Sequence, residues 1–582
     1  MRKTKIIATI GPASEDVGVL MDMMRAGVNV CRLNFSHGTH PEHQKRIDNI
    51  RAASRQFGQP IAIVLDTKGP EIRTGTLAAK KVNLKCGQRL VLTTRPVPGD
   101  ENEVQISYKE LPLQVGAGDN ILLADGLINL VVEDTTLTDI VCRVLNGGEL
   151  GEKKGVNVPG VRIGLPFISA QDRADIEFGI KNELDFIAAS FVRSADDVLE
   201  IRRIIEQFKA DIDIIAKIES QQGVDNLDDI IKVADGVMVA RGDLGVEIPA
   251  EDVPLVQKSI VEKCSRAGKP VIIATQMLES MIVNPRPTRA EVSDVANAIF
   301  EGADAIMLSG ETAAGKFPVE VVQTMARIAL RTEQALPYGE ILRRKRLLGN
   351  LSVTDAISYA CCATAFNLCI PAIISITRSG YTARMVSKYR PRAAVVAATH
   401  SLRVFNKLAL VWGVHPIIIK EIQGTDDLFE EAISCALKSD FIEDGDLVVL
   451  TAGIPAGFSG ATNMMKVHVV GTILAQGMGI GQKPVTGRVR TIASAVDLEA
   501  IEKGDIVVAI AASPDFGPYL ERIGALITEA GGLTSDAAIM GLTANIPVVV
   551  GVDEATRLLQ NGMVVTVDTP RGRIYQGTTR VL

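Results

Sequence analysis

The sequence predicts an α/β protein whose main domain is a (β/α)8 barrel. Eight short apolar runs recur along its first half, and all but one of the gaps between them show a simple helical pattern. The runs are TKIIATIGPAS, VNVCRLNFSHG, IAIVLDTKGPE, LDFIAASFVRS, IDIIAKIES, ADGVMVARGDLG, KPVIIATQMLES and ADAIMLSGETAAG. Near-continuous apolar strands that alternate with helices indicate a parallel sheet covered by helices. Eight such units favour a closed barrel over residues 1–68 and 165–336.

The exceptional gap follows the third run and has a different pattern. Segments such as KKVNLKCGQRLVLTT and DNILLADGLINLVVEDTT alternate apolar and polar positions, with Gly and Asp turns between them. This alternation is typical of antiparallel strands. We expect residues 69–164 to form a small inserted β-barrel, a lid over the barrel mouth, with TKGP and KKGVNVPG as hinges.

The pattern changes again after Leu336. The basic run Arg343–Arg346 is typical of a solvated connector, with a functional basic patch as the alternative. Helix and strand patterns then predict an open α/β domain at 350–472. The Gly-rich stretch AQGMGIGQKPVTG is typical of a linker. Strands rich in Val and Ile predict a last compact module at 485–582, and its resemblance to a known mobile domain implies an α/β domain of the swivelling type.

Composition argues against several classes of partner. The net charge of -7 argues against nucleic acid, whose binders usually present a basic face. There is no run of eighteen apolar residues and no signal-peptide pattern, so we expect a cytoplasmic protein that binds no membrane. The eight cysteines are scattered without a CxxC pair, as is typical of incidental thiols in a reducing compartment.

Polar residues at the ends of the apolar runs form the candidate site. Catalytic groups of such a barrel gather where the strands end, so we expect these residues to meet there. They are Asn34, Ser36, Asp66, Lys217, Glu219, Arg241, Asp243, Thr275, Ser309 and Glu311. Lys217 and Glu219 are two residues apart, a spacing that places both side chains on one face of a strand.

These residue types predict phosphoryl chemistry. Glu219 and Asp243 come from adjacent strands and can share one magnesium ion, which combines few carboxylates with substrate oxygens. Lys217 places a compact cation beside that metal. Arg32 and Arg73 supply guanidinium groups that suit phosphate oxygens. Together the groups fit the transfer of a phosphoryl group.

A second group of oxygen donors leaves two interpretations open. Asn34 and Ser36 alternate on one strand face, and Asp66 and Thr67 end the neighbouring strand. Four oxygen ligands with a single charge suit a monovalent cation. Ordinary hydrogen bonding between side chains explains the same pattern.

Several motifs together resemble those of pyruvate kinase. They are TIGPAS, CRLNFSHG, DTKGPEIR, KKGVNVPG, AKIES, VMVARGDLG, ATQMLESM and LSGETAAG, in the family's order within roughly residues 1–472. Members of this glycolytic family transfer the phosphoryl group of phosphoenolpyruvate to ADP, giving ATP and an enolpyruvate that is protonated to pyruvate. The family's barrel, inserted β lid and effector domain agree with the elements expected above.

The resemblance implies a role for each matching residue. Glu219 and Asp243 would bind Mg²⁺, while Asn34, Ser36, Asp66 and Thr67 would bind K⁺. The implied catalytic residues are Lys217, Arg32, Arg73 and Thr275. Substrate would contact Arg32, Lys217, Ala240, Arg241, Gly242, Asp243 and Thr275, and the nucleotide would contact Asn34, His37, Arg73 and Lys154. In this family a Glu at the place of Glu71 goes with potassium dependence, whereas a Lys there can supply the charge.

The loop after the run AIISI is a candidate effector site. Its residues are Thr377, Arg378, Ser379, Gly380, Tyr381 and Thr382, and they match the family's effector-phosphate loop. A plain capped turn between strand and helix is the alternative. Relatives that bind fructose bisphosphate use a Trp and an Arg in a loop corresponding to TAGIPAGFSG, which has neither. We therefore favour AMP or a sugar monophosphate.

The last module resembles the mobile phosphohistidine domain of phosphoenolpyruvate-utilising enzymes. The chain's histidines lie at positions 37, 40, 43, 400, 415 and 468, so none lies in this module. In the loop AGGLTSDAAIM, Asp536 stands where the related domains have their phosphorylated histidine. This excludes phosphohistidine transfer within the module. Asp536 would either form an acyl phosphate or, with Ser535, cap the following helix.

Two other functions remain open on the sequence. A magnesium-dependent barrel lyase or aldolase acting on a keto acid would share the metal and enolate chemistry, but would need neither the lid nor the two phosphate-facing arginines. A catalytically inactive regulatory protein is the non-enzyme alternative, although every residue named for catalysis is present. The resemblance also implies a homotetramer.

Overall fold

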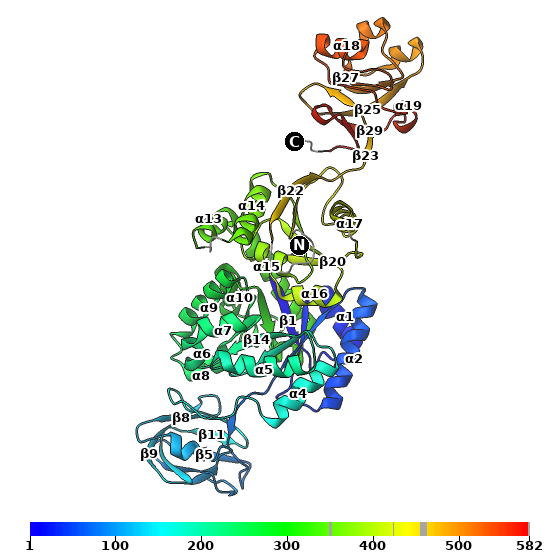
Figure 1. The fold of residues 1–582 in the computed structure, drawn as a ribbon. Coiled ribbons are helices and arrows are strands. Elements are labelled where there is room, and N and C mark those ends of the chain that lie inside the picture. Colours follow the sequence, from blue (N-terminus) through cyan, green and yellow to red (C-terminus); the bar gives the residue numbers. More distant parts are fainter. Residues whose placement is uncertain (349–351, 423, 454–461, 580–582) are drawn as a thin grey trace. The chain divides into compact units, whose positions relative to one another are not determined.

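The computed structural model describes residues 1–348, 352–422, 424–453 and 462–579 (Figure 1). The chain forms two compact units. One contains Met1–Gly349 and Ser401–Pro416, and the other contains Asn350–His400 and Ile417–Leu582. The first unit therefore includes a short segment, Ser401–Pro416, that is distant in sequence from the rest of the unit.

Eight parallel strands close into a barrel in the first unit, as the apolar runs predicted. They are β1 (Lys5–Thr9), β2 (Val30–Asn34), β3 (Ala62–Asp66), β13 (Phe186–Ala189), β14 (Asp213–Ile218), β15 (Gly236–Ala240), β16 (Val271–Ala274) and β17 (Ala305–Leu308). Each pairs with its neighbours in chain order, and β17 closes the barrel on β1. The strand residues are buried apart from half-buried Asn34 and Asp213, which explains their unbroken apolar character.

Helices surround the barrel strands (Figure 1). They are α1 (Val17–Ala26), α2 (His40–Phe57), α4 (Ala170–Lys181), α5 (Ala195–Gln207), α6 (Gln221–Asp225), α7 (Leu227–Val233), α8 (Arg241–Glu247), α9 (Val253–Ala267), η1 (Glu279–Ile282), α10 (Arg289–Glu301), α11 (Gly310–Ala313) and α12 (Pro318–Gln334). The helix α13 (Tyr338–Leu348) follows α12. Local chemistry sets several of their ends. Ser169 forms a capping box with Asp172 at the start of α4, and α1 ends at Gly27, whose φ of 116° favours glycine.

A curled β-sheet is inserted between β3 and α4, where the alternating pattern predicted it. Its elements are β4 (Ile72–Arg73), β5 (Lys81–Leu84), β6 (Arg89–Thr93), β7 (Glu103–Gln105), α3 (Leu111–Gln114), β8 (Asn120–Leu123), β9 (Ile128–Thr135), β10 (Asp139–Asn146), β11 (Gly148–Gly151) and β12 (Gly155–Asn157). Seven strands form one sheet in the order β4-β12-β8-β9-β10-β6-β7, and β11 pairs with β5. A bridge between Thr74 and Ile106 joins the two edges of that sheet, so it curls into a barrel-like domain with its own core.

An open α/β sheet begins the second unit. Its strands are β18 (Ala372–Ile376), β19 (Ala394–Thr399), β20 (Val414–Ile418), β21 (Leu447–Ala452) and β22 (Met464–Val469), in the order β20-β19-β18-β21-β22. The helices α14 (Val353–Asn367), α15 (Tyr381–Ser387) and α17 (Thr425–Lys438) belong to the same unit. The central strands β18, β19 and β21 are parallel, and β22 pairs antiparallel to β21.

The last module has an eight-stranded sheet in the order β23-β30-β29-β25-β26-β27-β28-β24. Its elements are β23 (Ile473–Gln476), β24 (Met478–Ile480), β25 (Val485–Ile492), η3 (Ala495–Ala500), β26 (Asp505–Ala509), η4 (Pro514–Tyr519), β27 (Ile523–Thr528), α18 (Asp536–Ala544), β28 (Val548–Val550), α19 (Ala555–Leu558), β29 (Val564–Asp568), η5 (Thr569–Arg571) and β30 (Arg573–Gln576). The described part of its sheet mixes parallel and antiparallel pairs.

The stretch predicted as a Gly-rich linker instead forms β23 and β24, which pair with β30 and β28. Close packing explains its glycines. A Cβ on Gly479 would lie 1.7 Å from the Thr569 carbonyl oxygen, and one on Gly477 would lie 2.5 Å from that of Val550. The glycines therefore allow backbones to approach within a sheet, and the prediction of a linker was wrong.

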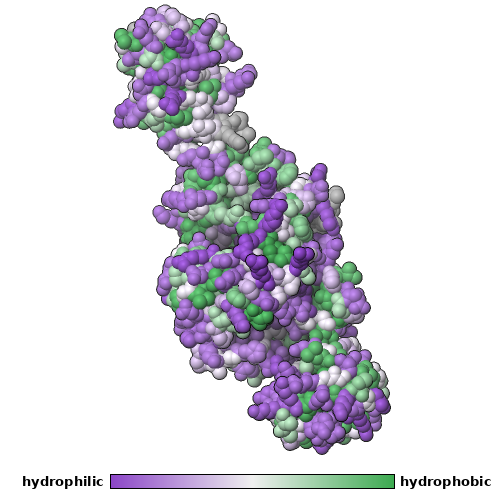
Figure 2. Space-filling model, turned by 180° about the vertical axis from the view of Figure 1, so that it is seen from behind, coloured by the Kyte–Doolittle hydropathy of each residue, from purple (hydrophilic) through white to green (hydrophobic). Residues whose placement is uncertain are grey.

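The basic run Arg343–Arg346 also differs from its prediction, because it lies within the helix α13 instead of a connector. Its three arginines are exposed, and Lys345 donates to Ser265. On the face shown in Figure 2, hydrophilic and hydrophobic residues are interspersed. None of the helices in the described ranges is both long and apolar enough to cross a membrane.

The segment that joins the first unit from afar contains α16 (Leu402–Lys407) and η2 (Leu408–Leu410). Leu410 is fully buried in an apolar cluster to which all eight barrel strands contribute. Lys407 lies 2.6 Å from both Asp211 and Asp213, and the Trp412 amide donates to Asp304. These acidic residues precede or begin strands, so the segment covers the N-terminal end of the barrel.

We expect Leu410→Ala to lower the free energy of unfolding by about 2–5 kcal/mol, because it would leave a cavity among the inward-facing strand residues. Leu402→Ala is the matched control. Leu402 lies in the same segment but is 56% exposed, so its loss should cost less than about 0.5 kcal/mol. Calorimetric melts of both variants test this, and equal effects would contradict the placement of Leu410.

Candidate active site

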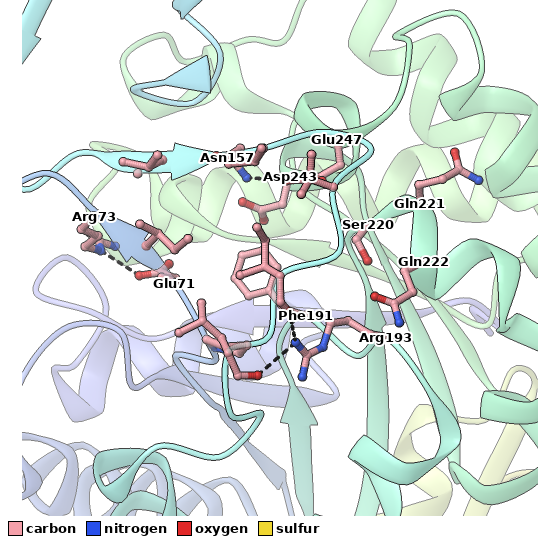
Figure 3. Close-up of a pocket in the computed structure, with 18 of the residues that line it drawn as sticks. Glu71, Arg73, Asn157, Phe191, Arg193, Ser220, Gln221, Gln222, Asp243 and Glu247 are labelled. Carbon is pink, nitrogen blue, oxygen red and sulfur yellow. Dashed lines mark hydrogen bonds and ion pairs between the residues drawn. The ribbon is translucent and has the colours of Figure 1, made fainter. Parts of the chain in front are cut away.

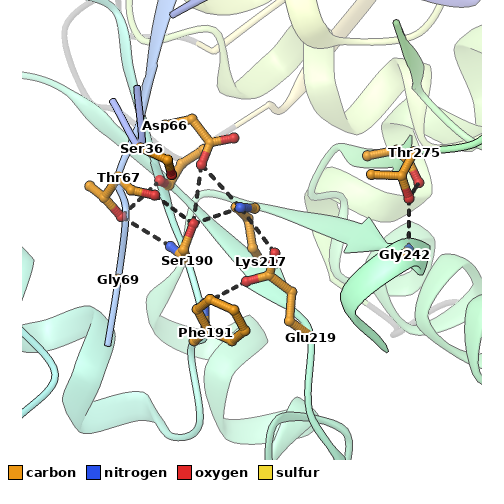
Figure 4. Close-up of polar contacts among 12 residues, drawn as sticks. Ser36, Asp66, Thr67, Gly69, Ser190, Phe191, Lys217, Glu219, Gly242 and Thr275 are labelled. Carbon is orange, nitrogen blue, oxygen red and sulfur yellow. Dashed lines mark hydrogen bonds and ion pairs between the residues drawn. The ribbon is translucent and has the colours of Figure 1, made fainter. Parts of the chain in front are cut away.

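Lys217 lies at the centre of the charged groups at the C-terminal end of the barrel (Figure 4). Its Nζ is 3.0 Å from Asp66 Oδ1 and 3.0 Å from Glu219 Oε1. It also donates to Ser190 Oγ at 2.6 Å. Because the side chain is only 10% exposed, these contacts take the place of water around the ammonium.

Arg32 provides a second cation beside Asp66. Its Nε donates to Asp66 Oδ2 at 2.6 Å, and its Nη1 donates to Thr9 Oγ1 at 3.0 Å. Asp66 therefore binds Lys217 through one carboxylate oxygen and Arg32 through the other. One buried carboxylate fixes both cations with respect to each other.

The pKa values follow from these contacts. Burial alone would lower the pKa of Lys217, but the negative charges of Asp66 and Glu219 outweigh it and raise that pKa. Burial would raise the pKa of Asp66, but Arg32 and Lys217 outweigh it and hold that pKa below its usual value. Lys217 and Asp66 are therefore both charged at neutral pH.

Glu219 and Asp243 behave in the opposite way. Burial raises the pKa of Glu219 to about 7, although Lys217 opposes the shift. Burial also raises the pKa of Asp243, while Lys217 and a hydrogen bond with Glu219 oppose it. Glu219 is buried and Asp243 is exposed, but the two carboxyl groups lie within hydrogen-bonding reach and are the kind of donor pair that a hard divalent cation prefers. The residues present therefore fit such an ion.

The four candidate potassium ligands take part in two sets of hydrogen bonds, one between Asn34 and Ser36 and one in which Ser190 contacts both Asp66 and Thr67. The side-chain oxygen of Asn34 accepts from the backbone amide of Ser36 at 3.2 Å. Ser190 Oγ donates to Asp66 Oδ1 at 3.2 Å and to the Thr67 carbonyl oxygen at 2.7 Å. Figure 4 shows Ser36, Asp66 and Thr67 side by side. Hydrogen bonds therefore explain part of this arrangement. This agrees with the interpretation of these four residues as ordinary hydrogen-bonding groups, which the sequence left open beside a monovalent-cation site.

Ser190 was not predicted, although it contacts three predicted residues. It follows β13, the fourth apolar run, for which the sequence analysis named no polar residue. The run AASFVRS nevertheless has a serine at the strand end. Its position at a strand end could have identified Ser190, because the other candidate site residues were predicted from the same kind of position.

The other predicted substrate residues lie where β15 and β16 end. Ala240 ends β15, and Arg241, Gly242 and Asp243 begin α8. The Gly242 amide donates to Thr275 Oγ1 at 2.8 Å. Figure 4 shows this pair set apart from Lys217.

A cavity of about 690 Å³ lies between the inserted domain and the barrel (Figure 3). Its lining includes three of the predicted nucleotide residues, His37, Arg73 and Lys154, together with Asp243. The volume falls in the range of small-molecule sites. The structure thus brings residues from β4, the loop before β12 and the barrel to one cavity.

Two polar contacts shape the cavity wall. Asn157 on β12 donates to Glu247 Oε1 at 2.8 Å, so the inserted domain is hydrogen-bonded to the end of α8. Glu71 Oε2 lies 2.7 Å from Arg73 Nε. Burial raises the pKa of Glu247, with Asn157 opposing the shift.

The candidate effector residues lie together at the turn from β18 to α15. Thr377 and Thr382 are buried, Arg378 is exposed, and Gly380 has a φ of 80°. Thr382 Oγ1 accepts from Thr462 Oγ1 at 3.0 Å. Residues 454–460 of the loop TAGIPAGFSG lie outside the described residues.

At the module loop, Ser535 is the N-cap of α18 and its side chain accepts from the Ala538 amide. Asp536 is the first residue of that helix. This agrees with the helix-cap interpretation of Ser535.

The barrel and the charged cluster define an enzyme that acts at the carboxyl ends of barrel strands. Three family models match the chain in order. The pyruvate kinase barrel domain matches residues 1–322, the pyruvate kinase alpha/beta domain matches 355–468, and the mobile domain of PEP-utilising enzymes matches 501–572.

Individual proteins match over the whole length. The chain is 53% identical to pyruvate kinase of Geobacillus stearothermophilus and 52% identical to that of Bacillus licheniformis, with 100% of each chain covered. A crystal structure of a pyruvate kinase from Cryptosporidium parvum matches with a TM-score of 0.77 and 41% identity, covering 80% of this chain and 96% of that one.

The chain therefore belongs to the pyruvate kinase family and is a phosphotransferase. The expected combination of barrel, α/β domain and mobile-domain module is confirmed. Neither a barrel lyase nor an inactive regulatory protein is favoured by these relatives.

We expect Ser190→Ala to lower kcat/KM for phosphoenolpyruvate about 10- to 100-fold, as a lost hydrogen bond to a charged group is worth about 1.5–3 kcal/mol. The reason is that Lys217 loses its 2.6 Å acceptor. Steady-state kinetics check this, with Ser293→Ala on an exposed face of α10 as the control. An unchanged Ser190→Ala enzyme would show that Lys217 does not depend on this contact.

Proposed function

We propose that the chain transfers the phosphoryl group of phosphoenolpyruvate to ADP by the residues gathered around Lys217. The bond from phosphorus to the enol oxygen breaks, and a bond to a terminal oxygen of ADP forms. The remaining enolate takes up one proton at its methylene carbon to give pyruvate. The supporting observation is a lysine kept charged by Asp66 and Glu219 at the barrel mouth, where negative charge develops.

We propose that Glu219 and Asp243 bind Mg²⁺. Their proximity supports this, because two neighbouring carboxyl groups, both with a raised pKa, offer oxygens that one divalent cation can share. Magnesium, when bound, supplies positive charge to the phosphoryl and carboxylate oxygens of the substrate. The Phe191 amide holds Glu219 in place by donating to Oε2 at 2.6 Å.

The remaining roles follow the position of each group. Lys217 and Arg32 are fixed on one carboxylate and would stabilise the phosphoryl group and the enolate. The backbone at Ala240–Asp243 would hold the substrate carboxylate. Thr275 would help to deliver the proton, since its hydroxyl is oriented by Gly242.

We propose that ADP occupies the cavity of about 690 Å³, against His37, Arg73 and Lys154. Asn34 would contribute at its edge. Arg73 lines the same cavity and would contact both the transferring phosphoryl group and the nucleotide phosphates. Its ion pair with Glu71 orients the guanidinium.

We further propose that Asn34, Ser36, Asp66 and Thr67 bind K⁺. Glu71 neutralises Arg73 through the 2.7 Å contact, so this pair adds no net positive charge beside the proposed nucleotide phosphates. A monovalent cation would supply that charge. This supports the potassium dependence that a Glu at this place implies.

For regulation, we propose that the turn Thr377–Thr382 binds AMP or a sugar monophosphate rather than fructose bisphosphate. Hydroxyl and amide groups from one turn support this proposal. We propose a cytoplasmic homotetramer, with Asp536 acting as a fold element and not as a phosphate carrier.

The first experiment measures pyruvate formation from phosphoenolpyruvate, ADP and magnesium in potassium or Tris-only buffer. We expect ADP-dependent turnover that needs potassium. Turnover in Tris-only buffer would contradict the proposed potassium site but not the proposed phosphoryl transfer. Absence of ADP-dependent turnover in the folded protein would contradict the proposed reaction.

Divalent-metal binding should weaken in acid. Because Glu219 must lose its proton to bind, a pKa of about 7 makes the apparent Kd rise about tenfold per pH unit below that value. Above it the Kd should level off. Titration of the substrate-free enzyme with Mn²⁺ between about pH 5.5 and 8.5 checks this. Glu219→Gln should bind weakly with a flatter profile, and a flat wild-type profile would contradict the assignment.

A further inference from the structure

Thr275 and the next residue have an unusual backbone conformation. Thr275 has a φ of 68° and Gln276 has a φ of 54°, both in the left-handed region. For a β-branched residue such as threonine this conformation is an outlier, because the side chain crowds the backbone. Two consecutive residues of this kind need support from their surroundings.

Arg241 provides that support. The register pairs Ala240 with Ala274, so the next residues, Arg241 and Thr275, leave their strands side by side. Arg241 Nη2 donates to the Thr275 carbonyl oxygen at 2.7 Å and to that of Gln276 at 3.3 Å. It thus holds the carbonyl groups of both strained residues.

Asp294 on α10 holds Arg241 in turn. Its Oδ1 lies 2.7 Å from Arg241 Nη1, and the arginine side chain is only 11% exposed. A buried guanidinium between a carboxylate and two carbonyl groups has little freedom to move. The contact therefore passes from α10 through Arg241 to the turn after β16.

The turn in question orients the hydroxyl of Thr275. With φ of 68°, Thr275 Oγ1 accepts from the Gly242 amide at 2.8 Å and donates to the Ala274 carbonyl oxygen at 2.6 Å. A return to the common backbone region would rotate Cα and carry the hydroxyl away from Gly242. The geometry of the proposed proton donor thus depends on the backbone conformation.

We propose that Asp294 is a positioning residue: through Arg241 it holds Thr275 in the left-handed conformation that keeps its hydroxyl against the Gly242 amide and the Ala274 carbonyl oxygen. This rests on the proposed function, because it assigns Thr275 to delivery of the proton. Asp294 is not one of the residues proposed to contact phosphoenolpyruvate or ADP, and its carboxylate pairs with Arg241. It acts on the conformation of the turn.

The test compares Asp294→Ala, Asp294→Asn and Thr275→Ala in the full-length enzyme. We expect Asp294→Ala to lower kcat about 10- to 100-fold, as misplacement of a catalytic group by about 1 Å does, with the KM for ADP changed less than about twofold. Asp294→Asn keeps an acceptor for Arg241 and should retain more activity than Asp294→Ala. The matched control is Glu301→Gln, which removes a charge from the same helix where Gln257 donates to Glu301 at 2.7 Å.

A double variant separates positioning from general damage. If Asp294 acts through Thr275, Asp294→Ala with Thr275→Ala should be no slower than Thr275→Ala alone. Exchange of the pyruvate methyl protons with D₂O, followed by NMR, should fall in Asp294→Ala in step with kcat. Loss in the double variant equal to the product of the single losses would overturn the proposal.

Three other results would also overturn it. They are an Asp294→Ala enzyme within about twofold of wild type in kcat, a Glu301→Gln enzyme as slow as Asp294→Ala, and Asp294→Asn as slow as Asp294→Ala with unchanged proton exchange. Failure of the proposed function itself is distinguishable, because the wild-type enzyme would then form no pyruvate from phosphoenolpyruvate and ADP.

Discussion

A lysine that remains charged inside the protein is the constraint on which this site depends. Burial alone would favour the neutral form of Lys217, and two carboxylates within 3.0 Å reverse that preference. One of them, Asp66, also binds Arg32, so the positions of both cations are coupled. Any movement of Asp66 would displace the two groups together and expose an uncompensated buried charge.

The barrel supplies these partners from distant parts of the chain. Strand register places Asn34 beside Asp66, and Asp66 beside Ala188, two residues before Ser190. Closure of β17 on β1 makes the ring continuous. A segment from beyond residue 400 then covers the other end, with Leu410 in the inner core. The charged mouth therefore rests on a rigid apolar cylinder.

Much of this was predictable from local patterns. The eight strands, the inserted β domain, the open α/β domain and the juxtaposition of Lys217 with Glu219 all follow from periodicity and residue type. The errors were of another kind. The stretch around Gly479 was predicted as a linker because local sequence does not show that the Thr569 carbonyl oxygen lies against its glycines. Ser190 was missed because one serine at a strand end is not distinctive.

The sequence by itself determined the residue types, their strand faces and hence the class of chemistry, since these depend on neighbours a few positions away. Tertiary structure alone decided which groups meet. It placed Ser190 against Lys217, Leu410 inside the barrel and Arg241 against the left-handed turn at Thr275. Such contacts join residues separated by tens to hundreds of positions. Their energies depend on burial and distance, which arise only when the chain has folded.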